Sequence, residues 1–582
     1  MEIFMKILLV AVNAKYIHSN PAVYSLRAYA KEYRELIEIA EYTGNQQTDE
    51  ILADIYQRRP DVAAFSCYIW NVEYIKEIIR NLRLVMPEIK IWVGGPEVSY
   101  NAIEFLEEMS EADGVMAGEG EHTFLSLVRY YAEAAGSLEQ IPGIVRQKES
   151  GGWGVNPAAK IPDMDDIPFL YEDLSEFTNR IIYYESSRGC PYSCSYCLSS
   201  IEKKVRFRSL PLVERELQYL LDRQVVQVKF VDRTFNCNHA HALGIWRYIQ
   251  EHDNGVTNFH FEIAGDLLNE EELSILKKMR PGLVQLEIGV QSVNPKTILE
   301  IDRVMDLGVL SEITGRILEG KNIHLHLDLI AGLPFEDYES VVNSFNEVYY
   351  MRPHQLQLGF LKLLKGSKMH RKAGDYGIAG RQNPPYEVLY TSWISFEEIL
   401  KLKGVEEMVE IYFNSHQFTY TMKKLLQAFK TPFAMFQAMS EYYENQKLTG
   451  QNHSRLKRTQ ILRSFALEYD FVQAALYEEL LLLDLYLREN SKSRPHWAAN
   501  LSVWKKEIAD FYRKETDEPQ FLLDYDGYNY RQRMHMTHLE VFQEDVLEIG
   551  RKDGYWVLFD YRKRNPLTGN AAYFIIDKDE CN

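Results

Sequence analysis

The sequence has few cysteines, no excess of basic residues and no long apolar run. Six cysteines in 582 residues are too few for the disulfide framework of a small secreted protein. A formal net charge of −19 argues against a general nucleic-acid partner, because phosphate binding depends on excess Lys and Arg. No apolar run reaches the length of a membrane span, and residues 1–6 lack the layout of a signal peptide. We therefore expect a cytoplasmic protein with reduced thiols and no membrane partner.

Half of the cysteines lie in one eight-residue stretch that follows an expected strand at 180–185. These are Cys190, Cys194 and Cys197. An iron–sulfur cubane normally takes one thiolate per iron, so a cubane on this stretch would leave one iron open to a small molecule. Zinc would need a fourth ligand, and the nearest downstream histidines, His239 and His241, are more than forty residues away. We prefer the iron–sulfur interpretation, with zinc as the alternative.

Residues 1–140 alternate short apolar runs with amphipathic stretches, at 7–12, 36–41, 62–66, 89–93 and 114–116. This alternation predicts a doubly wound parallel sheet with helices on both faces. Ligands of such sheets bind at the carboxyl ends of the strands. The turns at those ends are 13–20, 66–68, 94–97 and 118–121, and glycines in these turns would let the backbone approach a bulky ligand.

The rest of the chain divides into three parts. Residues 141–180, with a hairpin turn at 149–154 and several prolines, read as a linker. Residues 181–385 again alternate, with strands at 180–185, 227–231, 259–263, 284–288, 325–330 and 355–360. Six βα units are too few to close an eight-stranded barrel, so we expect a partial one. Residues 386–582 are mostly helical, at 396–412 and 461–487, and end in a β-hairpin within 554–576.

The cysteine spacing, with the aromatic Tyr196 before the last cysteine, resembles the cluster-binding loop of the radical S-adenosylmethionine (SAM) superfamily. The resemblance implies that Cys190, Cys194 and Cys197 hold a [4Fe-4S] cluster and that the open iron binds SAM. The family's usual Gly-Gly-Glu turn is absent, and Asp232 and Arg233 stand in its place. By the same resemblance SAM is held by residues at successive strand ends, namely Tyr196, Asp232, Arg233, Glu262, Glu287, Gln291, Ser292, Asp328 and Gly332.

Ser66 after the third strand and Gly94-Gly95 after the fourth resemble the cobalamin (B12) binding domain of corrinoid enzymes. The residues that this resemblance places around the corrin are Asn13, Ser66, Tyr68, Gly94, Gly95, Pro96, Glu97, Gly118, Glu119 and Gly120. The Asp-x-His-x-x-Gly turn that supplies cobalt with a histidine is missing. His18 lies in the corresponding turn, and the sequence leaves open whether it binds cobalt.

Taken together, the chain resembles the cobalamin-binding radical SAM enzymes, and in particular a bacterial subgroup with a C-terminal domain of unknown function. The resemblance implies reductive cleavage of SAM to a 5′-deoxyadenosyl radical, followed by methylation of an unactivated carbon of an unidentified small-molecule or peptide substrate. A flavodoxin or ferredoxin would supply the electron.

Three alternatives stay open at this point. One is a cobalamin-dependent radical cyclase or rearrangement enzyme, as in tetrapyrrole synthesis. A tRNA methylthiotransferase would need three further cysteines in the first domain, where only Cys67 is found. The last is a non-catalytic corrinoid-binding protein.

Two further features favour a structural interpretation. The segment 203–208 carries four cations, for which a solvated charged face is preferred to an anion site. His324 and His326 alternate along an expected strand and therefore share one face. We expect both to be core histidines.

Overall fold

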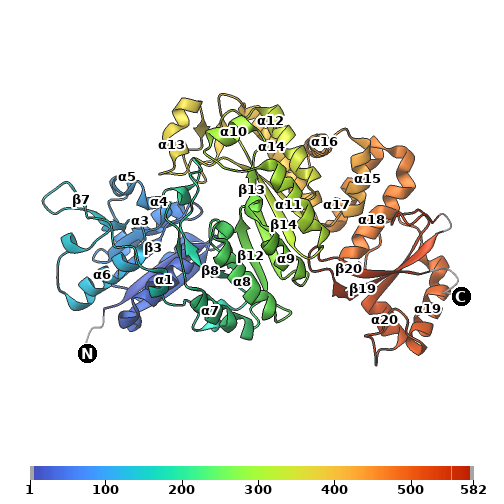
Figure 1. Cartoon of the computed structure of the whole chain (residues 1–582), viewed down its shortest axis with the longest axis horizontal. Coiled ribbons are helices and arrows are strands. Elements are labelled where there is room, and N and C mark those ends of the chain that lie inside the picture. The colour runs from blue at the N-terminus through green and yellow to red at the C-terminus, as the bar shows by residue number, and fades with distance from the viewer. Residues whose placement is uncertain (1–4, 552–553, 577–582) are drawn as a thin grey trace.

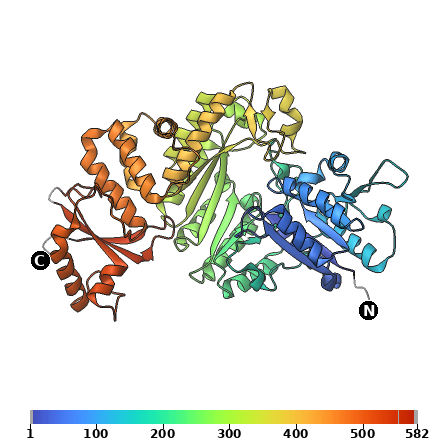
Figure 2. The same ribbon diagram turned by 180° about the vertical axis from the view of Figure 1, so that it is seen from behind.

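Three regions follow one another along the chain in the computed structural model, which describes residues 5–551 and 554–576. A doubly wound domain comes first, a six-stranded α/β region lies in the middle, and a helical region with a small antiparallel sheet comes last (Figure 1). Figure 2 shows the same succession from behind. None of the helices in the described ranges has the length and apolar content needed to cross a membrane. The predicted fold class is confirmed.

Five parallel strands form the body of the first sheet. They are β1 (Ile7–Asn13), β2 (Ile37–Thr43), β3 (Val62–Ser66), β4 (Lys90–Gly94) and β5 (Gly114–Met116), in the order β2-β1-β3-β4-β5. Successive residues of β1 point to opposite faces. Leu9 joins the core beneath α1 (Pro21–Tyr29) and α6 (Gly120–Glu133), and Val10 joins the core beneath α2 (Thr48–Arg58) and α3 (Val72–Val85). The strand order reverses between β1 and β3, which is where the ligand crevice of such a sheet opens.

The first sheet continues past residue 140, where the sequence predicted a linker. β6 (Ile144–Gln147) pairs antiparallel with β5, and β7 (Trp153–Val155) pairs antiparallel with β6. The predicted hairpin turn joins these two strands. The predicted boundary therefore cuts off two strands, because turn residues mark a hairpin without showing which sheet it extends.

Six parallel strands form the middle sheet, as predicted. In spatial order they are β8 (Ile182–Tyr184), β11 (Gln227–Phe230), β12 (Asn258–Ile263), β13 (Val284–Gln291), β14 (His324–Ala331) and β15 (Gln355–Phe360). The longest helices after the first five are, in order, α7 (Leu210–Asp222), α8 (His239–Glu251), α9 (Glu270–Lys278), α11 (Leu307–Glu319) and α12 (Tyr338–Tyr350). Within the described residues β8 and β15 stay at the two edges, so the sheet is a partial barrel.

The sixth helix of the barrel comes late in the sequence. Between β15 and this helix, α14 (Phe396–Val409), the chain forms α13 (Lys368–Lys372) and a small sheet of β16 (Ala379–Gly380) and β17 (Val388–Tyr390). Ile399 and Leu402 of α14 belong to the barrel core. The sequence places this helix in the C-terminal region, because the segment between β15 and α14 interrupts the alternation of strands and helices.

The last region combines helices with a three-stranded sheet. Its main helices are α15 (Thr419–Leu425), α16 (Pro432–Asn445), α17 (Arg455–Tyr469), α18 (Ala474–Arg488), α19 (Lys505–Asp517) and α20 (Tyr530–Met536). The predicted hairpin is present as β19 (Tyr555–Arg564) and β20 (Ala571–Ile576), and β18 (Thr537–Phe542) adds an unpredicted antiparallel strand.

Candidate cofactor-binding site

The three clustered cysteines lie on the loop after β8, at the carboxyl edge of the barrel. The short strand β9 (Ser187–Arg188) leads into this loop and pairs with β10 (Arg206–Phe207), which closes it. Cys190 and Cys194 are buried, Cys197 is partly exposed, and none of the three is in a disulfide. The loop therefore offers three free thiols at a strand end.

The other cysteines are distant from the loop in sequence, but Cys237 lies near it in space. Cys237 follows β11, and burial together with the neighbouring Cys190 raises its pKa to about 11. Cys67 is buried in the first domain, and Cys581 lies outside the described residues. Cys237 is thus the natural control when the three clustered cysteines are replaced.

Backbone hydrogen bonds hold the cysteine loop from two sides. The Ser195 N–H donates to the Ile301 carbonyl at 2.9 Å, and the Met369 N–H donates to the Ser195 carbonyl at 2.7 Å. The segments 299–304 and 362–372 therefore flank the loop. Neither segment carries a pattern that sequence reasoning singled out.

Arg303 is a candidate functional residue that the sequence did not reveal. Its Nη1 donates to Cys194 Sγ at 3.8 Å, and its Nη2 donates to the Gly289 carbonyl. Burial disfavours its charged form, but the neighbouring Tyr196 and Cys194 outweigh burial and raise its pKa. Its buried Nε finds no hydrogen-bond partner among residues 5–551 and 554–576. A partly buried cation with a buried, unused donor atom beside the cysteines fits an anionic group of a cofactor.

Gln291 lies next to Arg303 and carries a second unused polar atom. It ends β13 with a φ of 72°, and its buried Oε1 has no hydrogen-bond partner in the described part of the chain. A Cβ on Gly289 would overlap Gln291 Nε2, so the glycine gives this amide its room. Together Arg303 and Gln291 present a donor and an acceptor beside the cluster loop, as SAM requires.

Asp232 and Ser292 lie inside the protein. The fully buried Asp232 carboxylate accepts hydrogen bonds from the Ser186 N–H at 3.0 Å and from the Ser187 hydroxyl at 2.5 Å. Burial raises its pKa to about 7, although these hydrogen bonds oppose the rise. Ser292 is also fully buried and donates to Glu336. The direct SAM contacts that the sequence predicted for these two side chains do not match this placement, and Asp232 instead ties β11 to the strand before the cysteines.

Two other predicted SAM residues differ in exposure, since Arg233 is exposed and Gly332 is buried. Arg233 is more than half exposed, and its Nη1 lies 3.9 Å from Glu262. Gly332 has a φ of 87°, and a Cβ there would come 2.7 Å from Val388, so packing explains this glycine.

A row of charged residues crosses the inner face of the barrel. Strand register places Lys229 beside His260, and Glu287 between Glu262 and His326. Glu287 accepts hydrogen bonds from His260 Nε2 at 2.8 Å and from Lys229 Nζ at 3.3 Å. Burial opposes its ionisation, but His260 and Lys229 outweigh burial and hold its pKa at about 2. Burial raises the pKa of Glu262, which has no comparably close cation among the described residues.

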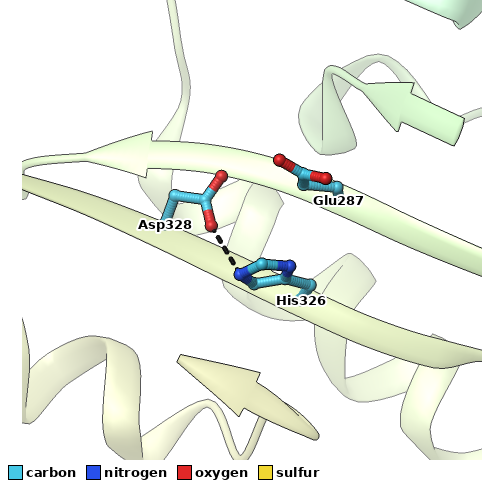
Figure 3. A group of neighbouring side chains, drawn as sticks. All are labelled: Glu287, His326 and Asp328. Carbon is cyan, nitrogen blue, oxygen red and sulfur yellow. Dashed lines mark ion pairs between the residues drawn. The ribbon is translucent and has the colours of Figure 1, made fainter. Parts of the chain in front are cut away.

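His326 and Asp328 complete this row on β14 (Figure 3). His326 Nε2 lies 2.8 Å from Asp328 Oδ1, and ligand atoms of Glu287, His326 and Asp328 lie within 4.8 Å of one another. Lys229 and His260 already pair with Glu287. His324 stacks on His354 at 5.1 Å, and burial is the main cause that lowers its pKa to about 3. His326 is buried on the inner face of the barrel, and His324 packs on His354.

Glycines at the carboxyl edge of the first sheet leave the backbone open to close approach by a ligand. Gly95 has a φ of 111°, and a Cβ there would come 2.5 Å from the Cys67 carbonyl, so only glycine fits. Gly118 has a φ of 83°, and a Cβ added to it would meet no described atom within 4 Å, so space lies open beside it. Ser66 accepts a hydrogen bond from Asn20 at 3.1 Å. Open space beside a glycine turn fits the predicted corrin.

The remaining predicted corrin contacts are partly buried or buried. Tyr68 stacks on the half-exposed Trp70 at 4.4 Å. Asn13 is buried and donates to the His18 carbonyl at 3.1 Å. Of the other predicted positions, Gly94 packs on Met116, Pro96 opens α4 (Pro96–Ser99), and Gly120 packs on Leu26.

His18 reaches from the first domain to the barrel. Its Nδ1 lies 2.6 Å from the Tyr183 hydroxyl on β8. Burial, Lys15 and Lys229 lower its pKa. One ring nitrogen is therefore engaged with the barrel.

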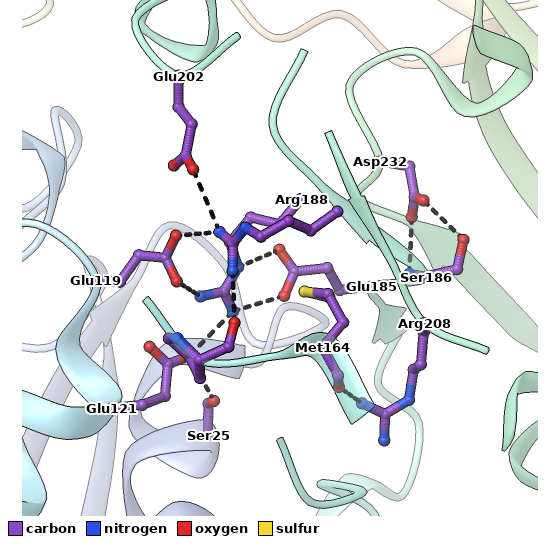
Figure 4. A network of polar contacts seen from close by, with 12 residues as sticks. Ser25, Glu119, Glu121, Met164, Glu185, Ser186, Arg188, Glu202, Arg208 and Asp232 are labelled. Carbon is purple, nitrogen blue, oxygen red and sulfur yellow. Dashed lines mark hydrogen bonds and ion pairs between the residues drawn. The ribbon is translucent and has the colours of Figure 1, made fainter. Parts of the chain in front are cut away.

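An ion-pair network joins the turn after β5 to the cysteine loop (Figure 4). Arg188 pairs with Glu119 at 2.7 Å, with Glu121 at 3.0 Å and with Glu185 at 2.7 Å. Arg206 also pairs with Glu119. Further along the same interface, the buried Glu97 accepts a hydrogen bond from Tyr386. Glu97 and Glu119, which the sequence predicts around the corrin, thus contact residues that follow the first domain in the chain.

The prediction of a solvated charged face at 203–208 is wrong for its arginines. Arg208 is buried and pairs with Glu216 at 2.5 Å, and Arg206 is engaged in the network. Lys203 and Lys204 are exposed, as predicted. A charge run does not show which of its members meet a buried carboxylate.

Comparison with known proteins agrees with this geometry. Residues 7–128 match the B12 binding domain, residues 184–348 match the radical SAM superfamily, and residues 374–559 match a protein of unknown function, DUF4080. The chain therefore combines these three domains. A radical SAM domain implies a [4Fe-4S] cluster and SAM, and the first domain implies cobalamin.

Individual relatives are distant. The chain is 24% identical over 349 residues to the cobalamin-dependent radical SAM methyltransferase TokK of Streptomyces tokunonensis, a match that covers 55% of this chain and 50% of TokK. It is 24% identical over 318 residues to the anaerobic magnesium-protoporphyrin IX monomethyl ester cyclase of Synechocystis sp., a match that covers 52% of this chain and 60% of the cyclase. The chain spans about half the length of the curated methyltransferases it matches.

A solved structure shares the fold. The cobalamin-dependent SAM radical enzyme OxsB with aqua-cobalamin bound matches with a TM-score of 0.57 at 14% identity, over 84% of this chain and 81% of OxsB. This likeness extends the agreement in fold beyond the two cofactor domains.

Proposed function

We propose that this chain, which joins a B12-binding domain to a radical SAM domain, is a cobalamin-dependent radical SAM methyltransferase acting on an unactivated carbon. One observation carries the proposal. Three free thiols at the barrel edge are tied by Arg188 to the glycine turn of the first domain, so the two cofactor sites adjoin. The cytoplasm, where thiols stay reduced, suits such a loop.

The residues divide into three groups by role. Cys190, Cys194 and Cys197 hold the cluster, and Arg303, Gln291 and Tyr196 hold SAM. Ser66, Tyr68, Gly95 and Gly118 would lie against the corrin. The cofactors, when bound, supply a 5′-deoxyadenosyl radical and carry the methyl group.

The residues of the protein would position SAM and the substrate. Arg303 would orient the carboxylate of SAM by charge, and the Gln291 side-chain carbonyl would accept a hydrogen bond from the SAM amino group. The Arg188 network joins the two domains beside the site. Glu287, fixed as an anion by His260 and Lys229, and the His326–Asp328 pair orient a polar substrate in the barrel.

A cyclase or rearrangement enzyme is the second candidate, and the 24% identity to the Synechocystis cyclase favours keeping it. A tRNA methylthiotransferase is disfavoured, because Cys67 is the only described cysteine of the first domain and is fully buried.

The proposal can be tested without knowing the substrate. Protein reconstituted anaerobically with iron, sulfide and cobalamin is reduced with dithionite and given SAM labelled in its methyl group. We expect 5′-deoxyadenosine, together with label in the extracted corrinoid. A cyclase would give 5′-deoxyadenosine with an unlabelled corrinoid, and a non-catalytic binding protein would give neither product.

A further inference from the structure

Three side chains with metal-binding atoms meet on the inner face of the barrel. Glu287 lies on β13, and His326 and Asp328 lie two residues apart on β14 (Figure 3). Residues two apart on a strand face the same side, and the register of the sheet places Glu287 beside His326. One ligand atom of each residue therefore lies within 4.8 Å of the other two.

His326 and Asp328 touch without forming a hydrogen bond. His326 is only 6% exposed, and its Nε2 lies 2.8 Å from Asp328 Oδ1. Both atoms are buried, and neither is aligned for a hydrogen bond with the other or with any further residue in the described ranges. Buried polar atoms without a partner are costly, so a third atom that binds both would stabilise them.

The spacing of these two atoms suits a metal ion. An ion about 2.1 Å from each ligand atom holds neighbouring ligand atoms about 3 Å apart. The separation of His326 Nε2 and Asp328 Oδ1 is already close to this value. Only the Glu287 side chain has to move closer to complete a set of three ligands.

Glu287 is held in place by one of its two carboxylate oxygens. Its Oε2 accepts hydrogen bonds from His260 Nε2 at 2.8 Å and from Lys229 Nζ at 3.3 Å. Within the described part of the chain no residue donates a hydrogen bond to Oε1. Neighbours that bind the outer atom of a ligand fix its orientation in many metal sites. Lys229 and His260 therefore orient Glu287 and leave Oε1 available.

The inner face of the barrel has an excess of negative charge. It carries three carboxylates and one lysine, namely Glu262, Glu287, Asp328 and Lys229. Arg233 lies 3.9 Å from Glu262, but its side chain is more than half exposed. Uncompensated charge in a partly buried place is unfavourable, and a divalent cation would offset it.

We propose that Glu287, His326 and Asp328 bind a divalent transition-metal ion of the class of Mn²⁺ or Fe²⁺. One imidazole and two carboxylates suit these ions better than Mg²⁺, which prefers oxygen ligands, and better than ions that select thiolates. Three ligands from two neighbouring strands leave the other coordination positions open toward the inside of the barrel. In the proposed function those positions bind an oxygen or nitrogen atom of the substrate, and this second step alone rests on that function.

The test is direct binding of Mn²⁺ to the full chain, reconstituted anaerobically with iron and sulfide. Unbound Mn²⁺ is measured by its electron paramagnetic resonance signal, and thiolates bind this ion poorly. We expect one Mn²⁺ per chain in the wild type. In His326→Phe, which keeps an aromatic ring without the ligand atom, the affinity should fall at least about tenfold.

The matched control is a histidine of the same strand. His324 lies two residues before His326, and its ring packs on His354 outside the group of three ligands. His324→Phe should therefore bind Mn²⁺ as the wild type does. The sequence predicts Glu287 and Asp328, but not His326, as SAM residues, so the effect of His326→Phe does not depend on SAM.

A second variant and a second ion extend the test. Glu287→Gln keeps the shape of the side chain and removes its charge, so it should also weaken Mn²⁺ binding at least about tenfold. Mg²⁺ should bind the wild type at least about tenfold more weakly than Mn²⁺, because imidazole is a poor ligand for it. Circular dichroism and iron content show whether each variant is folded.

A wild-type protein without saturable Mn²⁺ binding would overturn the inference, whatever the variants do. So would wild-type affinity in His326→Phe, or an equal loss in His324→Phe. A site that binds Mg²⁺ as tightly as Mn²⁺ would contradict it too, because the imidazole would then not be a ligand. Mn²⁺ is titrated without SAM, so this result is independent of the 5′-deoxyadenosine assay, whose failure would concern the proposed function.

Discussion

Replacing Arg303 by methionine is expected to slow SAM cleavage by about 100-fold while leaving the iron and sulfide content unchanged. Arg303 is the partly buried cation beside Cys194, and its buried Nε has no hydrogen-bond partner in the described ranges. Removing one preorganised charged donor from an active site costs a factor of this size. The assay is 5′-deoxyadenosine formation with dithionite, accompanied by equilibrium dialysis with SAM.

Two controls sharpen this prediction. Arg303→Lys keeps the charge but loses the planar fork, so it should recover only part of the activity. Arg316→Met removes an exposed arginine of α11 that pairs with Glu270, and it should behave as the wild type. Unchanged SAM affinity in Arg303→Met would show that Arg303 does not hold SAM.

The second large effect is on stability. Arg188→Met leaves Glu119, Glu121 and Glu185 without their shared cation at an interface where the Arg188 side chain is only 21% exposed. Breaking a buried ion pair by removing one partner costs about 3–5 kcal/mol. We expect a loss of this order in urea titrations, with hydrogen exchange rising in 114–121 and 184–208.

The matched control is a solvent-exposed ion pair. Arg129 pairs with Glu133 at 3.8 Å with half of its side chain in solvent, so Arg129→Met should cost less than about 1 kcal/mol. Adding Glu121→Gln to Arg188→Met removes one of the stranded charges and should restore part of the stability. If Arg188→Met costs no more than Arg129→Met, the network does not hold the two domains together.

Much of the fold was predictable because hydrophobic periodicity determines it. β3, β5 and β15 match their predicted ranges, since each is an apolar or alternating run bounded by turn residues. β18 was missed because its run, Thr537 to Phe542, is interrupted by His538 and Glu540. Glu540 is buried and paired with Arg494, a contact that no local pattern indicates.

The sequence predicts the part of the candidate site that a local motif forms. It does not predict the residues that only tertiary contacts bring to the site. Cys190, Cys194 and Cys197 stand out by spacing alone. Arg303 lies in an irregular segment after α10 (Pro295–Glu300), and only folding brings it to Cys194. The converse holds for Asp232, whose position at a strand end suggested a cofactor contact, whereas Ser186 and Ser187 bind it internally.

The central claim is that three thiolates hold an iron–sulfur cluster with one iron left for SAM. Its most direct test is the iron and acid-labile sulfide content of anaerobically reconstituted protein. We predict about four of each per chain in the wild type and in Cys237→Ala. Both should be nearly absent in the triple variant Cys190→Ala, Cys194→Ala, Cys197→Ala. A wild-type protein without sulfide-bridged iron, or a triple variant that retains it, would contradict the account.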